Sequence, residues 1–155
     1  GRLRYFTEWL KQLFGESECK DGKGVIPMSL QMSTDLHSMG QFLQDGRQIF
    51  FETVLTVEHI RKDVSLEHCS MAGKAASMHM LNQIVEESAR KAHLENGTPN
   101  IRLTVSELSA RAFGHMVYFF EKACAVSCYL TGVQPFDQPG VEAYKRNIKA
   151  AIKED

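Results

Sequence analysis

Short runs of β-branched and aromatic residues alternate along this chain with longer amphipathic segments, and this alternation limits the possible folds most strongly. The clearest run is Phe50–Val57; Ile101–Val105 alternates with a period of two, and Val25–Met32 is a third strand-length run with Pro27 near its start. Strands that alternate with helices of about ten or more residues are typical of βα units in a parallel sheet. The sequence therefore predicts an α/β fold.

Apolar residues that recur at three- and four-residue steps predict helices in the other segments. The expected helices cover Leu3–Phe14, Leu36–Leu43, Ala75–Leu94, Ser109–Leu130 and Val141–Ile152. Gly15 and Gly46 are expected to end the first two of these helices. Thr34 or Asp35 is the expected N-cap of the second helix, which places His37 in its first turn.

The predicted helix over Ser109–Leu130 is apolar around nearly its whole circumference. A helix without a polar face must be buried on all sides. Arg111, His115 and Glu121 interrupt the apolar run before it reaches the ~18 to 20 residues that a bilayer requires, which argues against a membrane span. We therefore expect this helix to be buried in a subunit interface or between domains.

Size and charge narrow the class of protein. With 155 residues and 43% hydrophobic content, the chain can form one domain with a core. Its 18 basic and 19 acidic residues are well mixed, which argues against nucleic acid or an anionic membrane as a partner. The start lacks an initiator methionine and a signal-peptide core, so we expect a cytoplasmic fragment of a longer protein.

The cysteines form no CxxC pair, and a reduced setting without disulfides is the simpler interpretation. Cys124 and Cys128 lie four residues apart and can share a helix face, but two thiols alone make a poor zinc site. We interpret both as small buried hydrophobic residues and expect neither a metal nor a cofactor.

Three polar motifs carry the chemistry of the chain. They are Gly15–Lys20, Ser33–Gln41 and Pro135–Lys145. The first contains the carboxylate of Glu16 and the second the imidazole of His37, each expected near the end of a regular element, where clefts and backbone dipoles tune acid–base groups. From their positions alone, Glu16, His37 and Lys145 are also compatible with ordinary solvent-facing side chains.

Together with residues 115–122 of the apolar helix, these motifs closely resemble the glucose-6-phosphate isomerases of the compact bacterial type. The likeness extends from about Trp9 to Asn147, and the third motif supplies eleven consecutive residues, which makes a chance match improbable. The resemblance implies a parallel-sheet, three-layer αβα sandwich of the sugar-isomerase (SIS) type. Residues 1–155 would then be the C-terminal domain of a longer enzyme.

The resemblance also implies a role for each matching residue. The catalytic glutamate of the family falls on Glu16, its ring-opening histidine on His37 and its lysine on Lys145. Aldose–ketose interconversion moves a proton between neighbouring carbons through an enediol, and general acids and bases suit this step without a metal or nicotinamide. The implied substrate is a hexose phosphate of glycolysis and gluconeogenesis, and the implied assembly is a homodimer in which His37 serves the neighbouring subunit.

The chain departs from the family pattern in two places. Cys19 stands where the family usually has glycine, which alters the loop after Glu16; in that loop we expect Glu18 to pair with Lys20 or Lys23. The phosphate-binding Ser/Thr loop and the Gly-Arg motif of the family are absent, so we expect these residues alone to be inactive. A sugar-phosphate-binding module without catalysis is the alternative hypothesis, and retention of all three candidate groups argues against it.

Overall fold

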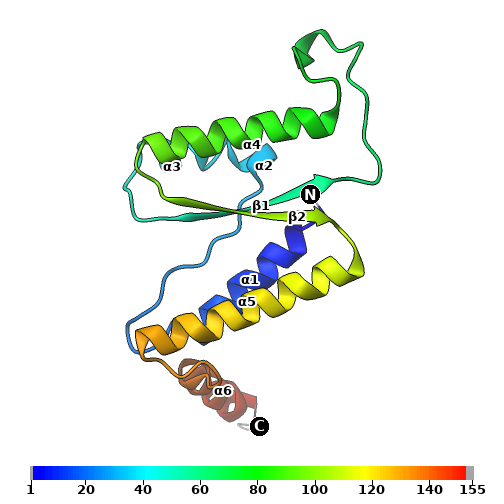
Figure 1. The fold of residues 1–155 in the computed structure, drawn as a ribbon. Helices are drawn as coiled ribbons and strands as arrows, with labels where there is room; N and C mark the ends of the chain where they lie inside the picture. The colour runs from blue at the N-terminus through cyan, green and yellow to red at the C-terminus, as the bar shows by residue number, and fades with distance from the viewer. Residues whose placement is uncertain (1, 153–155) are drawn as a thin grey trace. The chain divides into compact units, whose positions relative to one another are not determined.

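The computed structural model describes residues 2–152, and the chain divides into two compact units. The first, called here the two-segment unit, comprises Gly1–Leu30 and His115–Asp155, and the second comprises Gln31–Gly114. The colours of Figure 1 run along the chain, so the blue helix and the yellow-to-red helices mark the N-terminal and C-terminal segments of the two-segment unit.

The unit over Gln31–Gly114 is built on one βαβ crossover. Strand β1 (Glu52–His59) and strand β2 (Asn100–Glu107) pair in parallel and are connected through helix α4 (Met78–Glu95). Figure 1 shows α4 running along one face of this strand pair. The α/β class and the parallel pairing that the sequence predicts are confirmed, and both strands lie within two residues of their predicted starts.

Polar side chains fasten α4 to the strands. Thr56 Oγ1 on β1 donates a hydrogen bond of 2.8 Å to Glu86 Oε1 on α4. Nearer the end of α4, His93 Nδ1 lies 3.0 Å from both carboxylate oxygens of Glu52, and the two side chains are only 4% and 10% exposed. A buried polar pair is tolerated only when its partners are in place, so these contacts fix how the helix lies on the strands.

The third predicted strand, over Val25–Met32, is wrong. Residues 24–31 form no strand or helix, and Val25 and Ile26 are 52% and 79% exposed. Pro27 has no backbone N–H to give to a ladder, which disfavours a central strand here. Within the part of the chain that the structure describes, the sheet therefore has two strands.

The single helix predicted after this segment is also wrong. The structure has two short helices, α2 (Met32–Asp35) and α3 (Gly40–Asp45), with His37 in the turn between them. Asp35 does not cap a following helix; its Oδ2 accepts a hydrogen bond of 2.6 Å from Gln31 N, at the start of α2. This contact satisfies a backbone N–H at the start of α2. A further short 3-10 helix, η1 (Ser70–Ala72), precedes α4.

The two-segment unit is built around α1 (Arg4–Ser17) and α5 (Ala110–Thr131), which lie side by side. The rings of Phe6 on α1 and Phe120 on α5 meet edge to face with their centroids 5.8 Å apart. Leu13 and Phe14 of α1 pack against a buried cluster that contains Cys124 and Cys128 of α5. The interpretation of these two cysteines as buried hydrophobic residues is confirmed.

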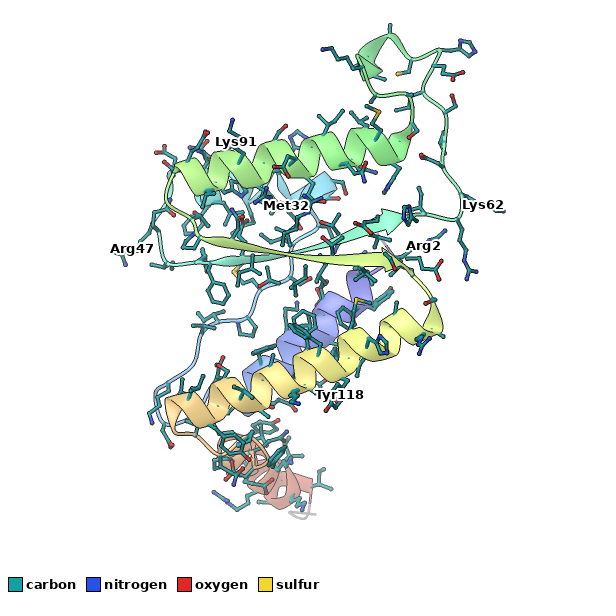
Figure 2. All side chains as sticks on the ribbon, viewed as in Figure 1. Arg2, Met32, Arg47, Lys62, Lys91 and Tyr118 are labelled. Carbon is teal, nitrogen blue, oxygen red and sulfur yellow. The ribbon has the colours of Figure 1, made fainter. Side chains whose placement is uncertain are left out.

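Within this chain α5 is buried on one face, and its further burial in a subunit interface or between domains stays a prediction. Its buried residues form one stripe at four-residue steps, Met116, Phe120, Cys124 and Cys128. The opposite face is open: Tyr118, labelled in Figure 2, is 65% exposed and Leu130 is 83% exposed. α1 covers only one face of α5, which is why the remaining apolar residues are uncovered. No helix in the described residues has the length and apolar character of a transmembrane span.

Candidate active site

Glu16 lies in the last turn of α1, not beyond the end of the helix as the sequence predicts. α1 continues through Gly15 to Ser17, and the N–H of Glu18 closes its final turn on the carbonyl of Phe14 at 2.9 Å. Glycine lowers helix stability by about 1 kcal/mol but does not prevent a helix that tertiary packing supports. The side chain of Glu16 is exposed and therefore accessible to a bound molecule.

The two carboxylate oxygens of Glu16 have different partners. Oε2 accepts a hydrogen bond of 2.8 Å from Gln138 Nε2, and Oε1 accepts a longer one of 3.4 Å from Gln12 Nε2. Gln138 is 122 residues away in sequence, and it belongs to the motif Pro135–Lys145. The first and third motifs therefore meet at one carboxylate, in a contact that their spacing in the sequence does not predict. Oε2 has the shorter hydrogen bond and the side chain as a whole remains exposed, which suits a group that accepts a proton from a ligand.

The loop after Glu16 is held by contacts different from the predicted ones. Glu18 is buried and accepts a hydrogen bond from Ser127 Oγ of α5, so the expected pairing of Glu18 with Lys20 or Lys23 is wrong. Lys20 Nζ instead contacts Asp137 Oδ1 at 2.9 Å, and Lys23 Nζ donates to the carbonyl of the last residue of α5 at 3.0 Å. Residues that are close in this loop point to different distant partners, which their spacing does not reveal.

Cys19 is accommodated where the resembling family usually has glycine. Among residues 2–152, Asp21 is the non-glycine residue with positive φ, so position 19 does not need the left-handed conformation that favours glycine. Cys19 Sγ donates to the carbonyl of Val25 at 3.2 Å, and burial, with the nearby Glu18 carboxylate, raises the pKa of this thiol. Gly24, at φ +86°, is the constrained position, because a Cβ there would lie 2.9 Å from Cys19 Cα.

Lys145 lies on α6 (Pro139–Ile152), the helix that starts directly after Gln138. Its Nζ donates to Glu142 Oε1 at 3.0 Å, one turn earlier on the same helix, and its side chain is 47% exposed. Within the part of the chain that the structure describes, no hydrogen bond or ion pair joins Lys145 to Glu16. The ammonium group is therefore placed on the element that follows Gln138, with its own carboxylate partner.

His37 is exposed in the turn between α2 and α3, and its backbone N–H donates to the carbonyl of Thr34 at 3.3 Å. It belongs to the unit Gln31–Gly114, whereas Glu16 and Lys145 belong to the two-segment unit. The role assigned to His37 therefore rests on the resemblance of its motif.

The other candidate chemistry in the chain concerns metal ligands and thiols. The described residues contain no group of three or more His, Cys, Asp or Glu side chains arranged to hold a metal ion. Cys124 is buried within the α1–α5 contact, and burial, with the neighbouring Cys128, raises its pKa to about 11. A thiol that is protonated at neutral pH is a poor nucleophile and a poor metal ligand.

Comparison with known proteins identifies similar chains. Glucose-6-phosphate isomerase of Acetivibrio thermocellus is 52% identical over 158 residues, and those of Caldanaerobacter subterraneus subsp. tengcongensis and Shouchella clausii are each 49% identical. Each match covers 97% of this chain but 35% of the relative, so the chain spans about a third of the length of these curated relatives. No protein-family model matches the chain.

The fold is similar to that of a hypothetical protein from Thermus thermophilus, known from a crystal structure. The TM-score is 0.85 and the identity 26%, over 98% of this chain and 39% of that one. The sequence match and the structural match both cover nearly the whole of this chain, and both cover well under half of the longer protein. The chain is therefore similar, over 97% of its own length, to about a third of each of these three glucose-6-phosphate isomerases.

Proposed function

We propose that this chain is the C-terminal part of a glucose-6-phosphate isomerase that interconverts glucose 6-phosphate and fructose 6-phosphate. The observation that carries the proposal is the contact of Glu16 with Gln138, which joins two of the three motifs on which the resemblance rests. The 52% identity to an isomerase of that name supports the same assignment. The complete protein would contain this chain and the segments that supply the rest of the site.

In this proposal Glu16 is the base that moves the carbon-bound hydrogen. The Glu16 carboxylate removes the proton from C2 of the open-chain aldose while the C1 oxygen gains a proton, which gives the enediol; the C2 hydroxyl then loses its proton as the same carboxyl group returns a proton to C1. Gln138 Nε2 holds Oε2 at 2.8 Å whereas Gln12 Nε2 contacts Oε1 at the longer distance of 3.4 Å, so Oε1 is the oxygen we assign to proton transfer. A fixed carboxylate favours the reaction because the reacting atoms must meet in a narrow range of positions.

His37 and Lys145 are assigned to ring opening, because the substrate is mostly a closed hemiacetal. Opening the ring needs a proton on the ring oxygen and removal of a proton from the anomeric hydroxyl, for which an imidazole and an ammonium are suitable groups. Both side chains are exposed at their positions, as groups that handle substrate must be. No metal or nicotinamide has a role in this scheme.

The proposed setting is the cytoplasm, in glycolysis and gluconeogenesis, with a homodimer of SIS-type subunits as the assembly. The open apolar face of α5, with Tyr118 65% and Leu130 83% exposed, is suitable for packing against another part of the complete protein or a second subunit. The phosphate-binding loop and arginine of the resembling family are not among these 155 residues. We therefore expect the chain alone to turn over substrate poorly, because phosphate binding energy positions the sugar.

The test replaces Glu16 in the complete protein. Glu16→Gln keeps the shape and the contact with Gln138 but removes the basic oxygen, so kcat for glucose 6-phosphate isomerisation is expected to fall by about 100- to 10,000-fold or more. Glu8→Gln is the matched control, because Glu8 lies on the same helix with Lys11 as its partner, and it is expected to keep wild-type turnover.

Three outcomes separate the hypotheses. Loss of turnover in Glu16→Gln with normal Glu8→Gln supports the proposal. Near-normal turnover in Glu16→Gln removes Glu16 from its assigned role. Binding of hexose phosphate by the wild-type protein without any turnover would favour the alternative, a non-catalytic sugar-phosphate-binding module.

A further inference from the structure

Lys20 has a shielded side chain near the start of the loop that follows α1. Its side chain is 7% exposed, although lysine is seldom buried without a partner. Nζ contacts Asp137 Oδ1 at 2.9 Å and also donates to the backbone carbonyl of Gln134. The ammonium is therefore satisfied by two acceptors from one short segment that lies more than a hundred residues away in sequence.

The segment that Lys20 contacts, residues 134–138, also contains Gln138. Asp137 and Gln138 are adjacent in sequence, and Gln138 Nε2 donates to Glu16 Oε2 at 2.8 Å. The contacts Lys20–Asp137 and Gln138–Glu16 thus join the same two short stretches, residues 16–20 and 134–138. They close a ring in which the position of one contact constrains the other.

Residues 16–20, which form one half of this ring of contacts, are themselves held in place. The N–H of Lys20 donates to the carbonyl of Glu18 at 2.9 Å, which makes a tight turn after α1. The buried carboxylate of Glu18 is held by Ser127 Oγ of α5. Because the loop is anchored at Glu18, the Lys20 ammonium is presented in one direction, toward Asp137.

We propose that Lys20 is a positioning residue for the proton-transfer step, acting on Glu16 through Asp137 and Gln138. Lys20 holds the segment 134–138 so that the Gln138 amide fixes Glu16 Oε2, which leaves Oε1, with its longer contact to Gln12, as the oxygen for proton transfer. The inference rests on the proposed function for its effect on turnover. The contact itself is independent of any reaction.

Lys23 provides the matched control. It lies in the same loop, and its Nζ donates to the Thr131 carbonyl at the end of α5 at 3.0 Å. Lys23→Met therefore removes a lysine that fastens the same loop to α5, without touching residues 134–138. Lys20→Arg is the conservative variant, since a guanidinium can still bind Asp137.

The experiment measures kcat and KM in the complete protein. Lys20→Met is expected to lower kcat by about 10-fold with little change in KM, because a base displaced by a fraction of an ångström loses reactive geometry. Lys20→Arg recovers part of the loss, and Lys23→Met keeps wild-type kcat. Gln138→Ala also lowers kcat, and Lys20→Met combined with Gln138→Ala is expected to be no slower than Gln138→Ala alone.

An unchanged kcat in Lys20→Met would overturn the inference, and so would losses that multiply in the double variant, which is the result expected of independent structural damage. Glu16→Gln is measured beside them, so that retained turnover in Glu16→Gln identifies a failure of the proposed function instead. The side-chain amide signals of Gln138 in the NMR spectrum then decide on the contact without reference to turnover. Their chemical shifts are expected to move toward those of a solvent-exposed glutamine in Lys20→Met and to stay at the wild-type values in Lys23→Met. Equal spectra in both variants would contradict the positioning role.

Discussion

At the scale of single residues, the surroundings of Glu16 and the cysteines decide what each group can do. Glu16 is held through Oε2 by Gln138 and remains exposed, whereas Cys124 is buried with its pKa raised to about 11. Glu16 was predicted as the base from the resemblance of its motif to the isomerase family, and this role stays a prediction. Gln138 was not identified as its partner, because a contact across 122 residues leaves no local pattern.

The cysteines provide a prediction at this scale. At pH 8, only about one part in a thousand of a thiol with a pKa near 11 is ionised, and the thiolate is the form that iodoacetamide attacks. In the folded protein, Cys124 is therefore expected to be alkylated far more slowly than the exposed Cys69, as followed by peptide mass spectrometry. Denatured protein is the control, in which both react. Equal rates in the folded protein would contradict the buried position of Cys124.

The same shift sets the direction of a pH effect on stability. Burial raises the pKa of Cys124 in the folded state above its ordinary value of 9.0, so ionisation favours the unfolded chain. The contribution of this thiol to stability is complete below pH 9 and is lost as the pH rises toward 11.

At the scale of elements, helices and β-branched strands followed from their periodicity, but their ends did not. β1 and β2 lie close to their predicted ranges, because a period-two pattern of branched residues is a strong local preference. The strand predicted over Val25–Met32, which contains Pro27, is absent. In place of the one helix expected after it, the structure has α2 and α3, with His37 between them. The conformation of such short segments depends on individual hydrogen bonds, such as the one from Gln31 N to Asp35 Oδ2, which the periodicity of the sequence does not describe.

The N-terminus of α4 gives a prediction for one element. Ser77 is the N-cap of this helix, and its Oγ accepts a hydrogen bond of 3.2 Å from Met80 N. Ser77→Ala is expected to lower the free energy of unfolding by about 1 kcal/mol, because a helix N–H loses its acceptor. Ser88→Ala, at an exposed position within the same helix, is the control and is expected to change it by less than about 0.5 kcal/mol. Equal effects in urea titrations would exclude the cap.

At the scale of the whole molecule, the α/β class was predictable, whereas the surroundings of α5 were not. Helix α5 was expected to be buried in a subunit interface or between domains; within this chain the stripe that faces α1 is covered, and burial of the other face stays a prediction. The relatives are about three times as long, since the chain spans 35% of each. Burial depends on every segment that packs against a helix. An apolar sequence pattern indicates that a helix is buried, but it does not identify the segments that pack against it.

The central claim is that Glu16 carries hydrogen between neighbouring carbons of the sugar. The most direct measurement follows deuterium when the complete protein converts glucose 6-phosphate in D₂O. A base that exchanges its proton with solvent before returning it leaves deuterium at C1 of fructose 6-phosphate. The wild-type protein and Glu8→Gln are expected to incorporate deuterium at C1, and Glu16→Gln is expected to incorporate essentially none. Incorporation by Glu16→Gln at the wild-type rate, or none by the wild-type protein, would contradict the account.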